Sequence, residues 1–316
     1  MPDKTPRFKP VYWSILIFLV AQLFMFAIVT RENGYLTAKN IYIPPQPEQS
    51  IVVWPQPETT SEAGVVTPAV PPTSSIGFIL VYFAALIVVV GLILFFIPLS
   101  ALKYLFRIIF AFLFSWGVFI LCVFWLPFIA AVILALLVGL GWLIYPKVWL
   151  HNMVMIIAMA SVAATFGRFA NPWTAMVLLL ALALYDFFAV RFGYMLWMAK
   201  KMSKSTALPA FILPHHKNEW VSTVRQVNLD DVAETEPEER DYSILGGGDI
   251  AFPLLLTASV YFARGLGSSL VIVGFAVAGL WAAYFIQSVF LKGKPMPALP
   301  PIAVSSLIGL LLVLYV

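Results

Sequence analysis

The feature that most constrains this chain is a series of nine apolar runs, each long enough to cross a lipid bilayer. Only 11% of the 316 residues are charged, whereas soluble domains carry about 25%. Backbone groups inside a bilayer find no water, so each run has to bond its own backbone as a helix. We therefore expect an all-α polytopic membrane protein, a single membrane domain of residues 1–316 with about nine transmembrane helices. The predicted spans are 11–30, 76–99, 106–126, 128–145, 149–167, 173–198, 249–266, 268–290 and 297–316.

Two long polar segments interrupt these spans and divide the chain into spans one to six, residues 1–198, and spans seven to nine, residues 246–316. Residues 31–75 are rich in proline and are predicted to form an external, extended loop. Residues 199–245 begin with lysines and end in an acidic run, which predicts a largely mobile cytoplasmic loop. Inside it, the apolar stretch 207–214 is expected to pack on the membrane surface or the helix bundle, with a plug or cleavage site as the alternative.

Basic residues gather in alternate connections, and this bias sets the predicted orientation. With a cytoplasmic N-terminus, the outer connections carry only Arg31, Lys39, Arg168 and Arg264, whereas the inner ones carry twice as many basic residues before the 199–245 loop is counted. We expect the N-terminus in the cytoplasm and the C-terminus outside.

Two acidic residues, Asp186 and Asp249, stand apart from the other 13, which all fall in the N-terminal tail or the two long loops. Asp186 lies inside the sixth predicted span and Asp249 at the start of the seventh. An ionisable residue at membrane depth is costly and indicates a functional site with a partner. Counting from the nearest inner charges gives both acids a similar, shallow cytoplasmic depth, so we expect the two carboxylates to meet.

The residues around Asp249 favour an opened backbone. Gly246, Gly247 and Gly248 precede it and allow the chain to leave helical geometry and approach another group closely. Pro253 has no N–H to bond the carbonyl of Asp249. Two carboxylates a few ångströms apart share a proton, so that one can deprotonate water while the other protonates a carbonyl oxygen, as in aspartic proteolysis. The same acids could instead carry protons or cations in a transporter or leak channel.

The last span opens with Pro297-Ala298-Leu299-Pro300-Pro301, at a depth that matches the two acids. Three prolines remove three backbone donors, and carbonyls exposed at this depth need protein or a water-filled cavity beside them. The simpler interpretation is a helix start, where proline is favoured in any case.

Together, these three elements resemble the motifs of one family. Tyr185-Asp186, Gly246-Gly247-Gly248-Asp249 and Pro297-Ala298-Leu299, on predicted spans six, seven and nine, are similar to those of the presenilin and signal peptide peptidase family of intramembrane aspartyl proteases. The resemblance implies a presenilin-like fold and an intramembrane aspartic endopeptidase that cleaves single-span membrane proteins within the bilayer. The compact loops suggest a prokaryotic, archaeal homologue located in the cell membrane.

The resemblance also implies a role for each motif. Asp186 and Asp249 would be the catalytic pair, with Gly246, Gly247 and Gly248 giving the chain close access to Asp249. Pro297, Ala298 and Leu299 would shape the site and contact an extended substrate, and Tyr185 would orient Asp186 or fill space. Water suffices as the nucleophile, so neither a metal nor an organic cofactor is implied, and no obligate partner subunit or nucleic acid is evident.

Other possibilities remain open at this point. A transporter using the same acids, a prepilin-type peptidase with a similar glycine–aspartate sequence, and an inactive family member are the alternatives. The sequence offers no obvious metal-ligand set, because the chain has one cysteine and three histidines, His151 and the adjacent pair His215-His216, and the pair is expected in a loop.

Overall fold

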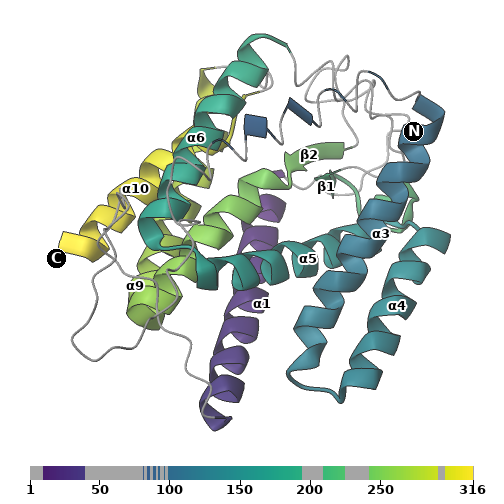
Figure 1. Cartoon of the computed structure of the whole chain (residues 1–316). Helices are drawn as coiled ribbons and strands as arrows, with labels where there is room; N and C mark the ends of the chain where they lie inside the picture. Colours follow the sequence, from purple (N-terminus) through teal and green to yellow (C-terminus); the bar gives the residue numbers. More distant parts are fainter. Residues whose placement is uncertain are drawn as a thin grey trace.

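The computed structural model describes residues 10–39, 99–193, 209–224, 242–290 and 296–315, with isolated helical positions between 81 and 96 (Figure 1). The described part is mostly helical. Its helices are α1 (Pro10–Ala38), α3 (Leu99–Val123), α4 (Phe128–Ile144), α5 (Val148–Phe169), α6 (Pro172–Arg191), α9 (Gly248–Val289) and α10 (Leu299–Tyr315). Between α6 and α9 lie strand β1 (Ala210–Pro214), the 3₁₀ helix η1 (Lys217–Val221) and strand β2 (Tyr242–Gly246).

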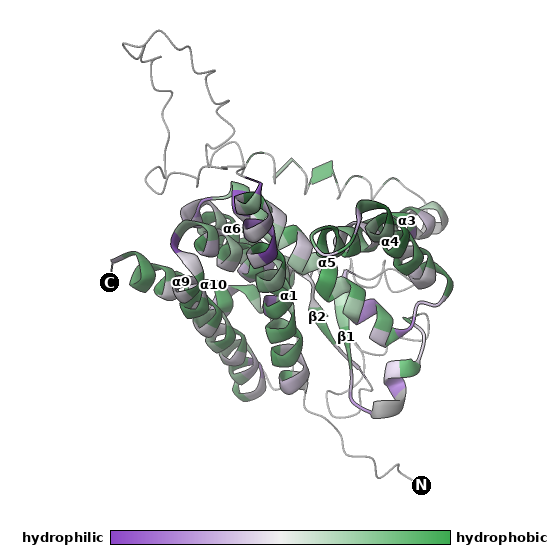
Figure 2. Cartoon of the chain, turned by 90° about the horizontal axis from the view of Figure 1, so that it is seen from below, coloured by the Kyte–Doolittle hydropathy of each residue, from purple (hydrophilic) through white to green (hydrophobic). Residues whose placement is uncertain are grey.

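Eight of the nine predicted spans correspond to these helices, whereas the second, 76–99, lies outside the described residues apart from isolated helical positions and residue 99. Among the described residues, α1, α3, α5, α6 and α9 are long and apolar enough to cross a membrane, while α4 and α10 are apolar but shorter. Most residues of these helices are hydrophobic and appear green in Figure 2. α9 contains both the seventh and the eighth predicted span, and its helical geometry breaks at Gly265, where φ is 83° and ψ is −174°. The boundary predicted between the seventh and eighth spans, at 266–268, therefore lies close to a real break in the helix.

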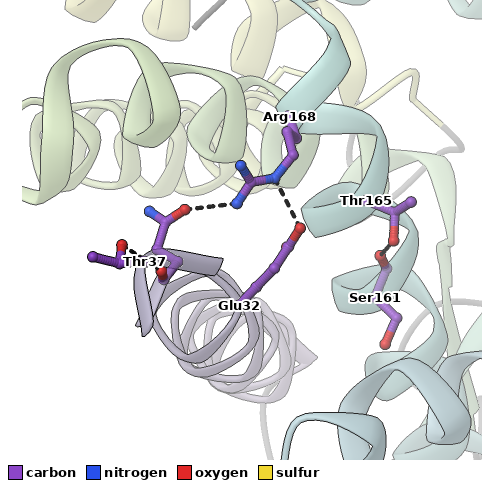
Figure 3. A network of polar contacts seen from close by, with 6 residues as sticks. Glu32, Thr37, Ser161, Thr165 and Arg168 are labelled. Carbon is purple, nitrogen blue, oxygen red and sulfur yellow. Dashed lines mark hydrogen bonds and ion pairs between the residues drawn. The ribbon is translucent and has the colours of Figure 1, made fainter. Parts of the chain in front are cut away.

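The predicted boundary of the external loop is wrong, because α1 continues through residues 31–38 to Ala38. A salt bridge of 2.8 Å joins Glu32 on α1 to Arg168 at the end of α5, and Arg168 also donates a 2.6 Å hydrogen bond to Asn33 (Figure 3). The Arg168 guanidinium lies 4.3 Å from the centre of the Phe262 ring on α9. These contacts of Arg168 link α1, α5 and α9 and stabilise the polar end of α1.

α5 is the central element of the packing. It contacts α1, α3 and α9, and it lies between the α3–α4 pair and the group formed by α6, α9 and α10 (Figure 1). Small residues allow these helices to approach closely, as expected where helices pack inside a membrane. A Cβ at Gly117 of α3, for example, would lie 2.6 Å from the Cα of Ala158 on α5. α9 joins the core around α5 to a second core shared with α6 and α10.

A two-stranded antiparallel sheet replaces part of the predicted 199–245 loop. β1 and β2 pair from Ala210 opposite Gly246 to Pro214 opposite Tyr242. Phe211, Ile212 and Leu213 of β1 are fully buried, so the apolar stretch packs on the bundle as one of the expected interpretations has it. Sequence reasoning missed the sheet because each strand has only five residues and the acidic run separates them.

Candidate active site

Asp249 lies in the first turn of α9, directly after β2 and three glycines. A negative charge is favourable there because the N-terminal N–H groups of a helix carry partial positive charge. The Asp249 carboxylate turns back and accepts a hydrogen bond from the backbone of Gly246. A Cβ at Gly246 would lie 3.0 Å from Asp249 Oδ2, so a side chain at this position would press on the carboxylate.

Asp186 lies near the cytoplasmic end predicted for α6, a helix whose start is well defined by its sequence. Asn171 caps that start by accepting a 2.7 Å hydrogen bond from the N–H of Thr174, and proline follows the cap. The Asp186 carboxylate interacts electrostatically with that of Asp249. One of its oxygens, Oδ2, is buried and has no hydrogen-bond partner among the described residues. The structure therefore places the two acids within electrostatic reach of each other and leaves Asp186 Oδ2 without a hydrogen-bond partner among the described residues.

The start of α10 supplies the third component of the site. The first N–H groups of a helix have no partner within the helix, so they are available to other groups. The backbone N–H of Leu299 donates to the Asp186 carboxylate. Pro297, Pro300 and Pro301 have no N–H to offer, which makes Leu299 a defined donor within this proline-rich sequence. Leu299 is itself buried between α6, α9 and α10, and this packing holds its amide in place.

An apolar groove of about 710 Å³ lies between α6, α9 and α10, and neither Asp186 nor Asp249 is part of its lining. Phe187, which directly follows Asp186, lines one wall, and Pro297 and Pro300 line another. Arg191 is the charged residue of its lining, at the end of α6. The groove offers space for apolar side chains near the start of α10.

The remaining predicted site residues have distinct positions. Gly247 makes the close approach expected of the glycines, since its N–H donates to the carbonyl of Pro209 at 3.0 Å and a Cβ would lie 2.6 Å from Met155 Cε. Gly248 begins α9, and Ala298 packs against the core around α5. Tyr185 precedes Asp186 on an exposed part of α6, with 38% of its surface accessible.

Two further residues near the site gave no recognisable signal in the sequence. Tyr284, on the second half of α9, lies within electrostatic reach of Asp249 and is hydrogen-bonded to Ser14 of α1. A tyrosine in an apolar run looks like any other aromatic residue of a span. His151 falls within the predicted span 149–167, and it is buried in α5, where its Nε2 lies 3.1 Å from the carbonyl oxygen of Ala210.

The chemistry available to this arrangement follows from its donors and acceptors. Two carboxylates in contact can divide the roles of general base and general acid between them. Within the described ranges, no three histidine, cysteine, aspartate or glutamate side chains converge as metal ligands. The site is therefore built from two acids, two backbone amides and an apolar groove.

Comparison with known proteins places this arrangement in context. A family model described as signal-peptide peptidase, presenilin aspartyl protease matches residues 60–316. The chain also resembles two solved structures of a presenilin family intramembrane aspartate protease. The structure in the C222 space group has a TM-score of 0.59 and 18% identity, covering 96% of this chain and 98% of that one. The structure in the P2 space group has a TM-score of 0.54 and 19% identity, covering 95% of each chain. At these identities the likeness shows a shared fold. A search of curated proteins gives no significant match.

Proposed function

The chain belongs to the signal-peptide peptidase and presenilin family of aspartyl proteases, and we propose that it hydrolyses peptide bonds of single-span membrane proteins within the bilayer, with Asp186 and Asp249 as its catalytic pair. The observation that carries the proposal is the electrostatic interaction between these two carboxylates, which come from helices separated by the whole 192–247 segment. Acids are costly in an apolar bundle, and two of them brought together are typical of a functional site.

In the proposed reaction, one carboxylate of the pair is ionised and the other holds a proton. The ionised carboxylate removes a proton from water as the water oxygen attacks the scissile carbonyl carbon, and the protonated carboxyl group donates its proton to the carbonyl oxygen. Breakdown of the resulting tetrahedral intermediate transfers a proton to the leaving amide nitrogen and breaks the C–N bond. The hydrogen bond from Leu299 keeps Asp186 in place, and that from Gly246 does the same for Asp249.

The groove near the start of α10 would hold apolar side chains of the substrate. Pro297 and Pro300 line this groove and leave the backbone there without N–H groups that compete for the substrate. Ala298 and Leu299 shape the same end of the site. A substrate helix has all its backbone groups bonded internally, so it has to unwind locally before a peptide bond reaches the acids.

The proposal includes a membrane arrangement. We propose nine spans, with the N-terminus and the 199–245 segment in the cytoplasm and the C-terminus outside, in the cell membrane of a prokaryote. The excess of lysine and arginine in the predicted inner connections supports this orientation. We also propose that the protein acts without an obligate partner subunit.

A cleavage assay tests the proposal. Purified protein in detergent is incubated with a single-span substrate beside the Asp186→Asn and Asp249→Asn variants, and products are identified by mass spectrometry. Glu32→Gln removes an acid near Arg168, at the end of α5 remote from β1, and serves as the control. We expect cleavage by wild type and by the control, and none by either aspartate variant. Full activity in either aspartate variant would refute the assigned pair.

The transporter alternative is not supported by the family match. It makes a separate prediction, namely ion flux in liposomes that depends on Asp186 and Asp249.

A further inference from the structure

The outer edge of β1 is bonded to α5 by side chains. Asn152 donates from Nδ2 to the carbonyl of Ile212 at 2.6 Å, and its Oδ1 accepts from the N–H of the same residue at 3.0 Å. The neighbouring His151 has its Nε2 3.1 Å from the carbonyl oxygen of Ala210. Asn152 is 3% exposed, so both of its hydrogen bonds are shielded from water. The Asn152 side chain thus bonds β1 as the peptide group of a neighbouring strand would.

This arrangement specifies the register of β1. The backbone N–H and C=O of one strand residue point to the same side. The backbone groups of Ile212 therefore point to α5, while those of Phe211 and Leu213 point to β2. After a shift of β1 by one residue, Asn152 would meet a residue whose backbone N–H and C=O point to β2. A shift of two would bring either Pro214, which has no N–H, or Ala210, whose carbonyl is already bound by His151. Ile212 is the residue of β1 that satisfies both ends of the amide.

The register of β1 determines where Asp249 lies. Ala210 pairs with Gly246 of β2, and Pro209 accepts the N–H of Gly247 at 3.0 Å. Gly246 in turn donates to the Asp249 carboxylate. A short series of hydrogen bonds therefore runs from the Asn152 side chain on α5, through the backbone of β1 and β2, to the carboxylate of Asp249 at the start of α9.

The rest of the 209–224 segment has its own attachments to the start of α5. Val148 donates to the carbonyl of Ser222 at 3.0 Å, and Val224 donates to that of Pro146 at 2.8 Å. Val148, Ile212 and Val224 also share a small apolar core. Loss of the Asn152 amide would leave these contacts in place and release only the register of β1.

We propose that Asn152 is a positioning residue of the proteolytic site, which holds β1 in one register and thereby holds Asp249 against Asp186. The inference rests on the proposed function for its effect on cleavage. Its structural part, the dependence of the Asp186–Asp249 contact on Asn152, does not.

Two substitutions separate the hydrogen bonds from the side-chain volume. Asn152→Asp has the same shape and keeps an acceptor for the Ile212 N–H, but it sets an oxygen against the Ile212 carbonyl. Asn152→Leu keeps the volume and removes both bonds. The matched control is Ser161→Ala on the same helix, which loses a buried 2.8 Å hydrogen bond to the carbonyl of Gly117 on α3 and touches neither strand.

The first readout is steady-state cleavage with mass spectrometry of the products. We expect both Asn152 variants to lower kcat on the order of 10²-fold with little change in KM, because small displacements of a catalytic group are costly. We also expect additional cleavage positions in the substrate, since Asp249 is no longer held at one place. Ser161→Ala should retain the wild-type kcat and the wild-type product set. A kcat and product set in both Asn152 variants equal to those of Ser161→Ala would overturn the proposal.

The second readout is independent of catalysis. Asp186→Cys and Asp249→Cys are combined in a Cys122→Ser background, and the rate of disulfide formation in membranes is measured with Asn152, with Asn152→Asp and with Ser161→Ala. We expect cross-linking to be at least tenfold slower with Asn152→Asp than with Asn152, and Ser161→Ala to leave the rate unchanged. Equal rates in all three would overturn the inference even if cleavage had changed. Absence of cleavage by wild type would refute the proposed function, while the cross-linking rates would still decide the role of Asn152.

Discussion

The contact between α9 and α10 at Gly279 gives the sharpest test of how packing supports the site. A Cβ at Gly279 would lie 2.6 Å from the Cα of Ile302 and 2.8 Å from the carbonyl oxygen of Pro301. Non-bonded carbon atoms settle at about 3.5–4.0 Å, so Gly279→Ala has to separate the two helices by about 1 Å. The atoms in the way belong to the backbone, which cannot rotate aside as a side-chain end can.

The expected effect on stability is the balance of two terms. Overpacking typically costs about 1–3 kcal/mol. The replacement of a helical glycine by alanine returns up to about 1 kcal/mol of helix propensity. We therefore expect a net loss of up to about 2 kcal/mol for Gly279→Ala.

The effect on cleavage should be larger than the effect on stability. Ile302 lies one turn after Leu299, whose N–H bonds Asp186, so a shift of α10 lengthens that hydrogen bond. A misplacement of about 1 Å can reduce catalysis on the order of 10²-fold. Thermal unfolding in detergent measures the first effect, and kcat on a single-span substrate measures the second.

Gly274 on the same helix provides the control. A Cβ there meets no atom within 4 Å, so Gly274→Ala should retain wild-type cleavage and gain slightly in thermal stability. If Gly279→Ala unfolds at the same temperature as Gly274→Ala and cleaves as fast, the close backbone contact does not support the site, and this reasoning fails.

Two further predictions concern the break in α9 at Gly265 and the salt bridge between Glu32 and Arg168. Gly265→Ala should cost about 1–3 kcal/mol in thermal unfolding, because φ of 83° with ψ of −174° suits glycine alone, whereas the helical Gly267→Ala should cost nothing. Equal melting temperatures for the two variants would contradict this explanation of the break in α9. Glu32→Gln and Arg168→Gln should each lower stability by about 1 kcal/mol, and a double-mutant cycle should show coupling between them. Strict additivity would mean that the salt bridge contributes no interaction of its own.

Several parts of the structure could be predicted because single residues carried the signal. Apolar runs predict helices in a membrane protein, since no other backbone arrangement is available to an isolated span. The proximity of Asp186 and Asp249 could be predicted because acids are rare at membrane depth and each needs a partner there. The boundary between spans 249–266 and 268–290 could be placed near the break at Gly265, because each run is long enough to cross the bilayer by itself.

Other parts depend on contacts between residues far apart in the chain. The polar end of α1 remains helical because Glu32 meets Arg168, 136 positions later, and no local pattern announces that contact. β1 is a strand because Asn152 and β2 bond its two edges, whereas the same five residues alone would be only a short apolar stretch. Tyr284 reaches Asp249 because the chain turns at Gly265, so its position follows from the packing of α9 rather than from its neighbours.

The dispersal of the site over α6, α9 and α10 has a consequence for biosynthesis. Asp186 enters the membrane more than a hundred residues before Leu299, so the growing chain carries the first acid long before the amide that holds it. Neither acid has its full set of neighbours until α10 packs against α6 and α9. With Asp186 and Asp249 as the catalytic pair that we propose, the protease becomes competent only after α10 has packed against α6 and α9.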